Sequence, residues 1–572
     1  MLKKMIASAS LPVDRGSRSA KIVEAQGSTS LSVTTFAVFQ ISTDSAITAV
    51  QFTAVDMAEA RVLLIAFPSQ ENVAACCRLA LGLTSKNVKV TFVALKKYVN
   101  QIKKVFSAPS FGNVEVEGLE EPRNRLFNRS KSMEDSFMPY LKKLIDARND
   151  EAKEITFTCL MADRYLPWSK DVAKRLEIPW FVFFGNSAME ARMHQVAHEL
   201  HIKRKLKVKG DRLSGVDKIV KAPGLTFLRP RDLLWSCSAY PAESLATGEF
   251  LIGAAGLVIN TFEDLELDTI NSIQNALPKP SGSAMDTKLF LIGPMSNDIT
   301  SGRLSHSAAA EDVSTSWMRI PPIQVLFSRK STGARFGAGF QRCIEWFNRQ
   351  IPCSVLYVHF GTISRLHPQE IVALAHALQS CQERFVWVLS QDHTHTELAM
   401  IADLQRRVEG RGRIVGGWVP QTQLLCHPCV AAFLSHCDWT SCLDAVVAGI
   451  PVLAWPQISD QHANARLLSN VLEMAIPLTK NMGQPPPARA GLANAIMSFV
   501  ANLLSAKEQR SFLDEKDIET GIRMVMRGDE GKHAKHRAVV LRGKAASAVY
   551  ENEGESETNW EALVTELQHI HI

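Results

Sequence analysis

Apolar runs alternate with helix-like stretches along most of the chain. The run VLLIAF at 62–67 is followed by a helical period through Leu79 and Leu81, and the run VKVTFVAL comes next at 88–95. The same alternation continues through 155–162, 179–185, 256–266 and 288–295. Continuous β-rich runs with helices between them indicate parallel strands that are buried on both faces. The pattern therefore predicts an α/β domain built on a parallel sheet.

The alternation restarts in a second half of similar size. The run SVLYVHFGT at 354–362 precedes a helix that Pro368 opens, with apolar positions on one face at Ile371, Leu374, Ala375 and Leu378. Further strand-like runs are RFVWVLS, RIVGGW, VAAFLSH and IPVLAWP. In open α/β sheets, ligands bind beyond the carboxyl ends of the strands. The loops 68–72 and Gly361-Thr362, each after the first strand of its half, should therefore face a cleft between the halves.

Breaks in the pattern divide the chain. We expect a domain over 57–295, a linker with an insertion over 296–341, a second domain over 342–545 and a C-terminal helix over 546–572. A further loop-like insertion lies near 481–512. The last helix carries an apolar face that should dock on another element, formed by Trp560, Leu563, Val564 and Leu567. Residues 1–56 are rich in Ser, Thr and Ala and poor in acids, which fits either a disordered or a transit-like extension.

Composition narrows the class of protein. The chain has 572 residues, 46% hydrophobic and 21% charged, as expected for a soluble globular protein. A net charge of +6 without a Lys/Arg block argues against nucleic-acid binding. No run approaches the ~18 apolar residues of a membrane span. Eleven sparse cysteines fit reduced thiols in the cytoplasm, or in a plastid if residues 1–56 are a transit peptide.

Chemically useful residues are densest between 411 and 468. Trp418 beside Pro420 offers a flat ring on which a base could stack. VAAFLSH ends at His436, and a helix begins near Thr440 and Ser441, where free N–H groups and the dipole suit a diphosphate.

Further along the same stretch, Asp444 could accept hydrogen bonds from a ribose diol, and Asp460 and Gln461 could bind sugar hydroxyls. Gly449 and Pro451 should end the helix that carries Asp444.

Each of these residues also has a purely structural interpretation. Trp418 alone is more often a packed aromatic, Ser441 a helix cap and Asp444 a solvated helix charge. Cys426 and Cys429 have the spacing of a zinc knuckle, but the buried strand that follows leaves no short loop to close a metal site. We therefore expect no metal, and we give weight to the donor-binding interpretation because its residues follow successive strands.

The segment from Trp418 to Gln461 closely resembles the signature box of the plant family 1 UDP-dependent glycosyltransferases. That box reads W-x-P-Q, then H-C-G-W-N-S, an acidic residue, G-x-P and a final D/E-Q pair. This chain retains most of it, at Trp418, Pro420, Gln421, His427, Pro428, Phe433, His436, Cys437, Trp439, Ser441, Gly449, Pro451, Pro456, Asp460 and Gln461. LVINTFEDLE, LIGPM and CIEWFNRQIPCSVLYVHFGT also look like segments of this family, and the resemblance covers roughly 57–570.

The resemblance implies the α/β GT-B fold, which has two facing Rossmann-like domains with parallel sheets. The N-terminal domain would bind the acceptor and the C-terminal domain the UDP-sugar. The implied reaction transfers a sugar, by default glucose, with inversion to a small hydrophobic hydroxyl or carboxyl acceptor of plant secondary metabolism. UDP-sugar would be the co-substrate, with no cofactor and a monomer as the default state.

The resemblance also assigns roles by position. Trp418 would stack on uracil and Gln421 would contact it. His436 and Ser441 would hold the diphosphate, with Thr362 facing the phosphates. Thr440 could also donate to a phosphate, and Trp439 is a further donor-binding position. Asp444 would bind the ribose, and Asp460 and Gln461 the transferred sugar.

Two departures from the family pattern affect these roles. The family's catalytic histidine is Asn72 here, preceded by Glu71 instead of glycine. An amide has no useful basicity near neutral pH, so Asp163, the family's partner acid, is left without its usual partner. Asp163 or Glu71 could act directly as the base, or the acceptor could already be ionised.

The second departure lies inside the box, where glycine, asparagine and glutamate are replaced by Asp438, Thr440 and Asp444. Thr440 could still cap the helix. Like charges ~4 Å apart at an effective dielectric near 20 repel by about 4 kcal/mol, which is roughly a thousandfold in affinity. Asp438 could therefore oppose a diphosphate unless it turns to solvent or pairs with His436. Two hypotheses remain: an active UDP-glycosyltransferase, or a catalytically impaired homologue that binds a small molecule or a protein.

Overall fold

The structure is a computed structural model. It describes residues 21–29, 32–43, 46–49, 60–107, 113–121, 129–148, 157–204, 207–209, 212–214, 222–229, 232, 245–248, 251, 253–277, 287–295, 343–361, 366–389, 395–416, 419–478, 512–550 and 554–570. The expected insertions at 296–341 and near 481–512 lie almost entirely outside the described residues. Contacts divide the chain into two compact units, Met1–Ala58 and Glu59–Ile572.

The first unit contains a small antiparallel sheet in the order β1 (Lys21–Thr29), β2 (Ser32–Thr43), β3 (Ala46–Ala49). These strands differ from the disordered or transit-like extension that composition favours. The sequence of β2, SVTTFAVFQIST, is rich in β-branched and aromatic residues, which favour strands. Whether the segment is a targeting signal stays a prediction.

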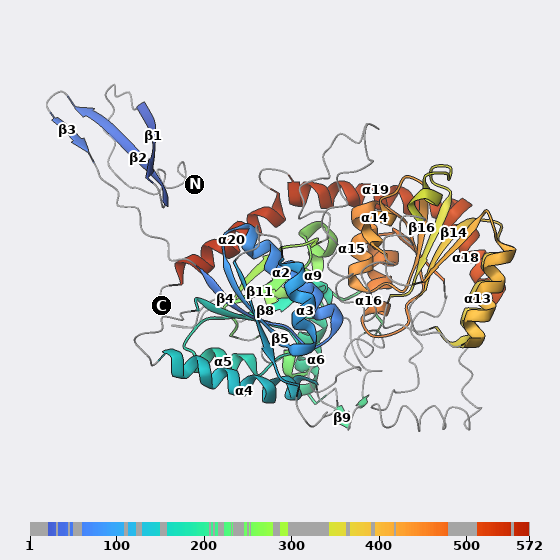
Figure 1. Ribbon diagram of the computed structural model, residues 1–572, viewed down its shortest axis with the longest axis horizontal. Helices are drawn as coiled ribbons and strands as arrows, with labels where there is room; N and C mark the ends of the chain where they lie inside the picture. Colours follow the sequence, from blue (N-terminus) through green and yellow to red (C-terminus); the bar gives the residue numbers. More distant parts are fainter. Residues whose placement is uncertain are drawn as a thin grey trace. The chain divides into compact units, whose positions relative to one another are not determined.

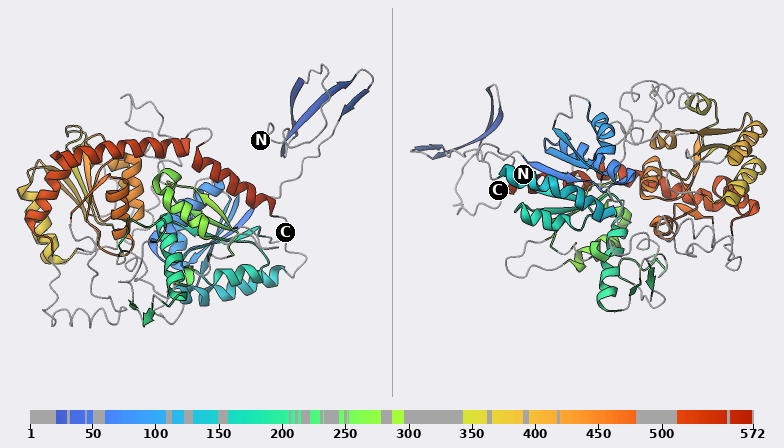
Figure 2. Two further views of the ribbon diagram at one scale, coloured as in Figure 1. Left: turned by 180° about the vertical axis from the view of Figure 1, so that it is seen from behind. Right: turned by 60° about the horizontal axis from the view of Figure 1, so that its bottom comes forward.

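The second unit begins with a seven-stranded parallel sheet (Figures 1 and 2). Its strands, in spatial order, are β12 (Lys288–Leu291), β11 (Gly256–Ile259), β8 (Trp180–Phe184), β7 (Cys159–Asp163), β4 (Arg61–Ile65), β5 (Lys89–Leu95) and β6 (Val114–Leu119). Val62 and Leu64 belong to one buried cluster, whereas Leu63 and Ile65 belong to another. Strand β4 therefore packs on both faces, as the continuous apolar run predicts.

Helices and two short strands connect this first sheet. They include α2 (Gln70–Ser85), α3 (Lys96–Val105), α4 (Arg129–Arg148), α5 (Ser169–Arg175), α6 (Ala188–Ile202), β9 (Lys207–Lys209), β10 (Arg212–Ser214) and α9 (Glu263–Ala276).

A six-stranded parallel sheet forms the second domain. Its spatial order is β15 (Gly412–Gly416), β14 (Arg384–Leu389), β13 (Val355–His359), β16 (Val430–Ser435), β17 (Val452–Ala454), β18 (Ala475–Pro477). Tyr357 faces one core cluster, and its neighbours Leu356 and Val358 face the other. The prediction of two Rossmann-like domains with parallel sheets is confirmed.

The helices of this half include α12 (Pro368–Ser380), α13 (His395–Arg407), α14 (Gln421–Leu425), α15 (Trp439–Ala448), α16 (Gln461–Arg466), the π-helical turn η5 (Leu467–Val471), α18 (Glu515–Arg527), α19 (Asp529–Tyr550) and α20 (Glu555–His569). Helix α12 starts at Pro368 as predicted, and a capping box between His367 and Glu370 closes its first turn. Its expected apolar face is buried.

Each sheet reverses its strand order beside its first strand. Strand β4 lies between β5 and β7, and β13 lies between β14 and β16. Such a switch point opens a crevice at the carboxyl ends of the two central strands. The loops after β4, β7, β13 and β16 are therefore the places to look for a site.

The chain ends by returning to the first domain. Leu563, Val564 and Leu567 of α20 pack into the cluster that also holds Val62 and Leu64 of β4. Asn559 Oδ1 accepts a hydrogen bond from the Leu291 backbone N–H of β12 at 3.1 Å. The expected apolar face of the last helix thus lies against the N-terminal sheet.

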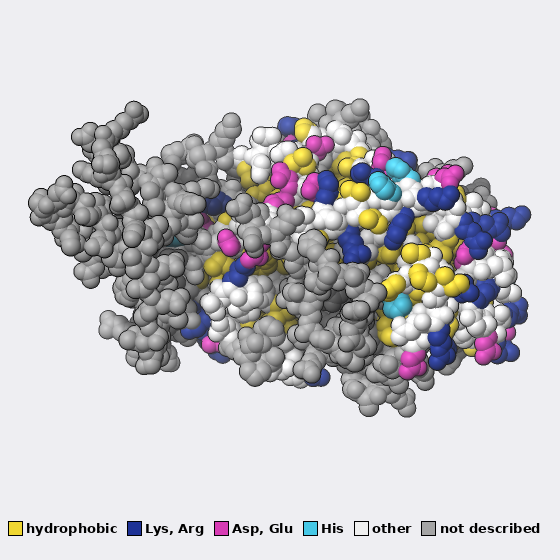
Figure 3. Space-filling model, turned by 90° about the horizontal axis from the view of Figure 1, so that it is seen from above, with side chains coloured by type: hydrophobic (Ala, Val, Ile, Leu, Met, Phe, Trp, Pro, Cys, Tyr) yellow, Lys and Arg dark blue, Asp and Glu magenta, His cyan; other side chains and the backbone are white. Residues whose placement is uncertain are grey.

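Charges of both signs are interspersed with apolar side chains on the face seen in Figure 3. Within the described part of the chain, no helix has the length and apolar character that a bilayer crossing needs.

Candidate functional site

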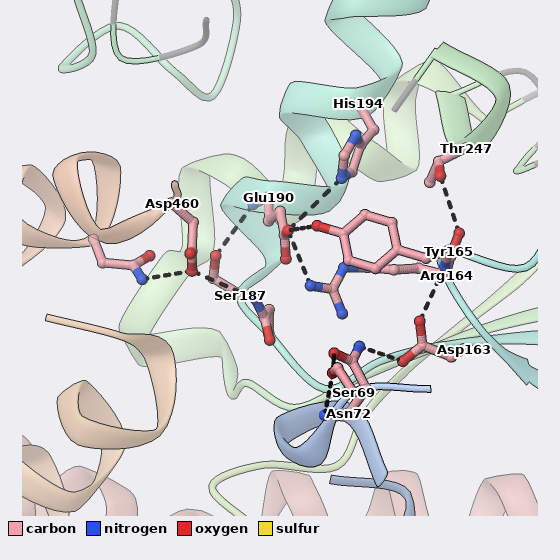
Figure 4. A network of polar contacts seen from close by, with 12 residues as sticks. Ser69, Asn72, Asp163, Arg164, Tyr165, Ser187, Glu190, His194, Thr247 and Asp460 are labelled. Carbon is pink, nitrogen blue, oxygen red and sulfur yellow. Dashed lines mark hydrogen bonds and ion pairs between the residues drawn. The ribbon is translucent and has the colours of Figure 1, made fainter. Parts of the chain in front are cut away.

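The loop after β4 brings Asn72 onto Asp163. Ser69 caps α2 by accepting from the Asn72 backbone N–H at 3.2 Å, and its hydroxyl donates to Asn72 Oδ1 at 2.5 Å. This contact orients the amide so that Nδ2 donates to Asp163 Oδ2 at 2.7 Å (Figure 4). Asp163 thus lacks its usual histidine partner, as expected, and the amide of Asn72 takes the place of the histidine.

Asp163 is fully buried at the end of β7. Its second oxygen, Oδ1, accepts from the Tyr165 backbone N–H at 3.0 Å. Burial raises the pKa of Asp163 above its usual value, although Arg164 and these hydrogen bonds oppose the shift. With both oxygens bound and no exposed surface, Asp163 positions Asn72 and is poorly placed to take a proton from an acceptor.

Glu71 lies beside Asn72 in the first turn of α2, and its side chain is exposed. Desolvation of the carboxyl group by the surrounding protein nevertheless raises the pKa of Glu71 to about 7, and the negative charge of Asp438 adds to the shift. Asp460 also raises it, while His436 and Arg164 oppose it. Glu71 therefore lies within electrostatic reach of the donor-box residues of the other domain.

The loop after β16 forms the start of α15. Asp438 is the N-cap of that helix, with its Oδ1 accepting from the Ser441 backbone N–H at 2.9 Å. By sequence, Thr440 and Ser441 are possible caps, but the cap is Asp438, which has the extended N-cap backbone. The predicted end is confirmed: Gly449 closes α15 in the left-handed region, with φ 65°.

His436 forms an ion pair with the cap. Its Nε2 lies 3.5 Å from Asp438 Oδ2, and the ring is buried. Burial opposes protonation, but the charge of Asp438 raises the pKa of His436 above its usual value. Burial likewise opposes ionisation of Asp438, but His436 and Ser441 hold the pKa of Asp438 below its usual range. Each member of the pair therefore stabilises the charged form of the other.

Gly361 allows His436 to approach the turn after β13. Its φ is 70°, and a Cβ there would lie 2.5 Å from His436 Nε2. Only glycine combines this backbone conformation with such a close approach. The two loops of the second switch point are thus packed directly on each other.

Gln421, Ser441 and Asp444 form one buried network. Gln421 Nε2 donates to Ser441 Oγ at 3.1 Å and to Asp444 Oδ2 at 3.0 Å. Its Oε1 accepts from Nδ1 of His359, at 2.6 Å. Burial lowers the pKa of His359 to about 4, so this imidazole is neutral.

Asp444 has both oxygens engaged, since Oδ1 accepts from Thr422 Oγ1 at 2.8 Å. Burial raises the pKa of Asp444 to about 6. The structure thus brings the expected uracil and ribose residues together, but it bonds them to one another.

Asp460 and Gln461 begin α16. Asp460 Oδ2 accepts from Asn464 Nδ2 at 2.9 Å and from Asn186 Nδ2 of the first domain at 3.4 Å. Burial, and then the charge of Glu190, raises the pKa of Asp460 to about 7. Gln461 Oε1 accepts from the backbone N–H groups that precede the helix, at 2.9 and 3.0 Å. Asp460 therefore touches both domains.

Trp439 connects the domains. Its Nε1 donates to the Asn260 carbonyl of the first domain at 2.8 Å, and the side chain is 2% exposed. Thr440 is only partly buried at the same helix start. The predicted donor residues Thr362 and Trp418 lie outside the described residues.

A buried network that the sequence did not reveal lies behind Asp163 (Figure 4). Arg164 Nη2 and the Tyr165 hydroxyl both donate to Glu190 Oε1, at 3.1 and 3.0 Å. Burial opposes ionisation, but Arg164 holds the pKa of Glu190 at about 2. Arg164 directly follows Asp163 in the chain, and this adjacency is only a weak indication in the sequence that Arg164 belongs to the site. Glu190 lies within a helix where a charge normally faces solvent, so only the fold reveals it.

Among the described residues, no group of three or more His, Cys, Asp or Glu side chains is placed to hold a metal ion.

Comparisons with known proteins give matches over most of the chain. Residues 345–507 match the family model described as UDP-glucoronosyl and UDP-glucosyl transferase. The chain is 30% identical over 442 residues to the 7-deoxyloganetic acid glucosyltransferase of Catharanthus roseus, covering 73% of this chain and 85% of that protein. It is 26% identical over 443 residues to the UDP-glucose flavonoid 3-O-glucosyltransferase 7 of Fragaria ananassa, covering 76% of this chain and 77% of that protein.

Solved structures show the same fold. Phytolacca americana UGT2, complexed with UDP-2fluoro-glucose and pterostilbene, is similar with a TM-score of 0.65 and 20% identity, over 90% of this chain and all of that one. Medicago truncatula UGT71G1, complexed with UDP-glucose, is similar with a TM-score of 0.66 and 19% identity, over 90% of this chain and 99% of that one. The expected GT-B fold is thereby confirmed.

Proposed function

Because the chain belongs to the plant UDP-glycosyltransferase family, whose model is described as UDP-glucoronosyl and UDP-glucosyl transferase, we propose that it transfers glucose from UDP-glucose to a small hydrophobic acceptor with inversion. An acceptor oxygen attacks the anomeric carbon and UDP departs from the opposite side. The step requires a base for the acceptor proton and fixed positive partners for the leaving diphosphate.

Glu71 is the base in this proposal. Asn72 has no basic atom, and Asp163 is buried with both oxygens bound. Glu71 is exposed beside them, and its raised pKa of about 7 lies where general bases work best. Asn72, held by Ser69 and Asp163, keeps the loop in place so that Glu71 can reach the acceptor.

The start of α15 receives the diphosphate. Its N–H groups, its dipole and His436, whose pKa the charge of Asp438 raises, favour an anion once the carboxylate of Asp438 has moved from the Ser441 N–H. Gln421 and Asp444 lie at the same end of the sheet and bind the uridine in this proposal. Asp460 and Gln461, at the start of α16, bind the sugar. Trp418 and Thr362 retain the roles that the family pattern assigns to them. UDP-sugar is a co-substrate here, and no separate cofactor takes part.

The observation that carries the proposal is the convergence of four loops at two switch points. Gly361 and His436 come from the second sheet, and Asn72 and Asp163 from the first. The test is incubation of the full chain with UDP-glucose and a panel of alcohols, phenols and carboxylic acids, with products detected by mass spectrometry. A product heavier by one glucosyl unit supports the proposal.

Loss of turnover is the alternative. Asn72 at the base position and Asp438 at the diphosphate position both favour a homologue that binds a small molecule or a protein without transferring sugar. If no acceptor in the panel gains a sugar while UDP still binds, this alternative is correct.

We also propose a cytoplasmic monomer, or a plastid protein if residues 1–56 act as a transit peptide. Size-exclusion chromatography and a fluorescent fusion test these two points.

A further inference from the structure

A carboxylate of the protein itself occupies the anion position at the start of α15. We propose that Asp438 is an internal anion that competes with the donor diphosphate for this helix start and so determines the affinity for UDP. The inference rests on the proposed function, because it concerns the same nucleotide position. It adds a specificity-determining residue that the family pattern does not contain.

The geometry of competition is direct. Asp438 Oδ1 takes the Ser441 backbone N–H at 2.9 Å, and Oδ2 lies 3.5 Å from His436 Nε2. These are the two donors that the proposed function assigns to the diphosphate. A backbone N–H gives one strong hydrogen bond at a time. A phosphate oxygen can therefore bind there only after the carboxylate of Asp438 has moved.

The surroundings add to this effect. The negative charge of Asp438 raises the pKa of three other carboxyl groups, those of Glu71, Asp444 and Asp460. The cationic side chains that interact electrostatically with Asp438 are Arg78 and His436. A bound diphosphate would bring further negative charge into a region that is already acidic, unless Asp438 turns away. Its side chain is 26% exposed, so it has solvent on one side into which it can turn.

The two nitrogens of His436 have different surroundings. The Nδ1 atom of His436 is buried and has no hydrogen-bond partner within the described part of the chain. The ring is only 2% exposed, and its Nε2 is directed at Asp438 and at the Gly361 turn. Buried polar atoms are normally hydrogen-bonded in native proteins. Nδ1 points away from Asp438, so Nε2 is the atom that would meet a phosphate at this position.

A purely structural role for Asp438 makes a different prediction. Asn caps helices about as well as Asp, so a pure cap would tolerate Asp438→Asn without any change in nucleotide binding. Removal of the negative charge changes UDP affinity only if the carboxylate competes with the phosphates. Asp438→Gly removes both the cap and the charge, and glycine is also a tolerated N-cap residue.

The experiment is calorimetric titration of UDP into the full chain and three variants: Asp438→Asn, Asp438→Gly and the control Asp514→Asn. Asp514 caps α18 in the same way, accepting from the Asp517 backbone N–H at 2.9 Å, far from the donor box in the sequence. We expect both Asp438 variants to bind UDP at least tenfold more tightly than the wild type, and the Asp514 variant to bind it within twofold.

Thermal melting of the free proteins supplies a second readout. Asp438→Asn loses the ion pair with His436, so its Tm without ligand should fall while the Tm increase caused by UDP grows. Unchanged or weaker UDP binding by Asp438→Asn, with the wild type binding measurably, would overturn this inference and leave the proposed function standing. Absence of UDP binding by all four proteins at millimolar concentration would overturn both.

Discussion

Replacing Glu71 by Gln tests the base assignment through its pH dependence. A pKa of about 7 leaves Glu71 about 1% ionised at about pH 5, whereas the ordinary value of 4.5 would leave roughly three quarters of it ionised. A base works only when deprotonated. Wild-type kcat/KM for an aliphatic alcohol should therefore fall about tenfold per pH unit below about pH 7.

The expected loss in Glu71→Gln is about 10²–10⁴-fold at about pH 8. The variant should also show a flat pH profile, so that its deficit shrinks toward acid. Initial rates of UDP release from about pH 5 to pH 9 measure both quantities. Glu120→Gln, an exposed glutamate that pairs with Lys96, is the control and should behave as the wild type.

A carboxylic-acid acceptor sharpens the comparison. Such an acceptor is already ionised and needs no base, so Glu71→Gln should transfer glucose to it at nearly the wild-type rate. Alcohol transfer by Glu71→Gln within threefold of the wild type across this pH range would refute the assignment of Glu71 as the base. A wild-type profile without an inflection near about pH 7 would refute it as well.

Three further predictions concern the framework of the site. Trp439→Phe removes an N–H donor and leaves a buried carbonyl of the other domain unpaired, so urea denaturation should show a loss of about 1–3 kcal/mol in the free energy of unfolding; an unchanged value would mean that this contact contributes nothing. Leu563→Ala, at a fully buried position of α20, should lose about 2–5 kcal/mol by the same assay, and a loss below that range would argue against docking of α20 on the first domain. Gly361→Ala should weaken UDP binding, because its Cβ would displace His436, whereas Gly410→Ala has a similar positive φ with open space and should change only stability; equal UDP affinities for the two variants would contradict this.

Much of the fold could be predicted because parallel strands buried on both faces need continuous apolar runs. Strand β4 shows this directly, since neighbouring residues such as Leu63 and Leu64 enter different core clusters. The start of α12 followed from Pro368 and the end of α15 from Gly449, because both residues have strong backbone preferences. The sheet over β1–β3 was not predicted, because Ser and Thr are also common in chains without fixed structure.

The candidate site was harder to predict, because several side chains could form the same hydrogen bond and only the folded structure determines which of them does. Asp438, Thr440 and Ser441 can all cap a helix, and only the backbone of the folded loop decides for Asp438. The bond between Asn72 and Asp163 joins residues 91 positions apart, and no local pattern reveals it. The mutual bonding of the residues expected to bind uridine likewise depends on three loops meeting.

The central claim is that the loops at the carboxyl end of the second sheet bind uridine diphosphate. A crystal structure of the full chain grown with UDP tests it most directly. The account predicts the phosphates at the start of α15, within hydrogen-bond distance of the Ser441 N–H and His436, with the carboxylate of Asp438 turned away. UDP bound at any other place on the molecule, or with Asp438 still bonded to the Ser441 N–H, would contradict it.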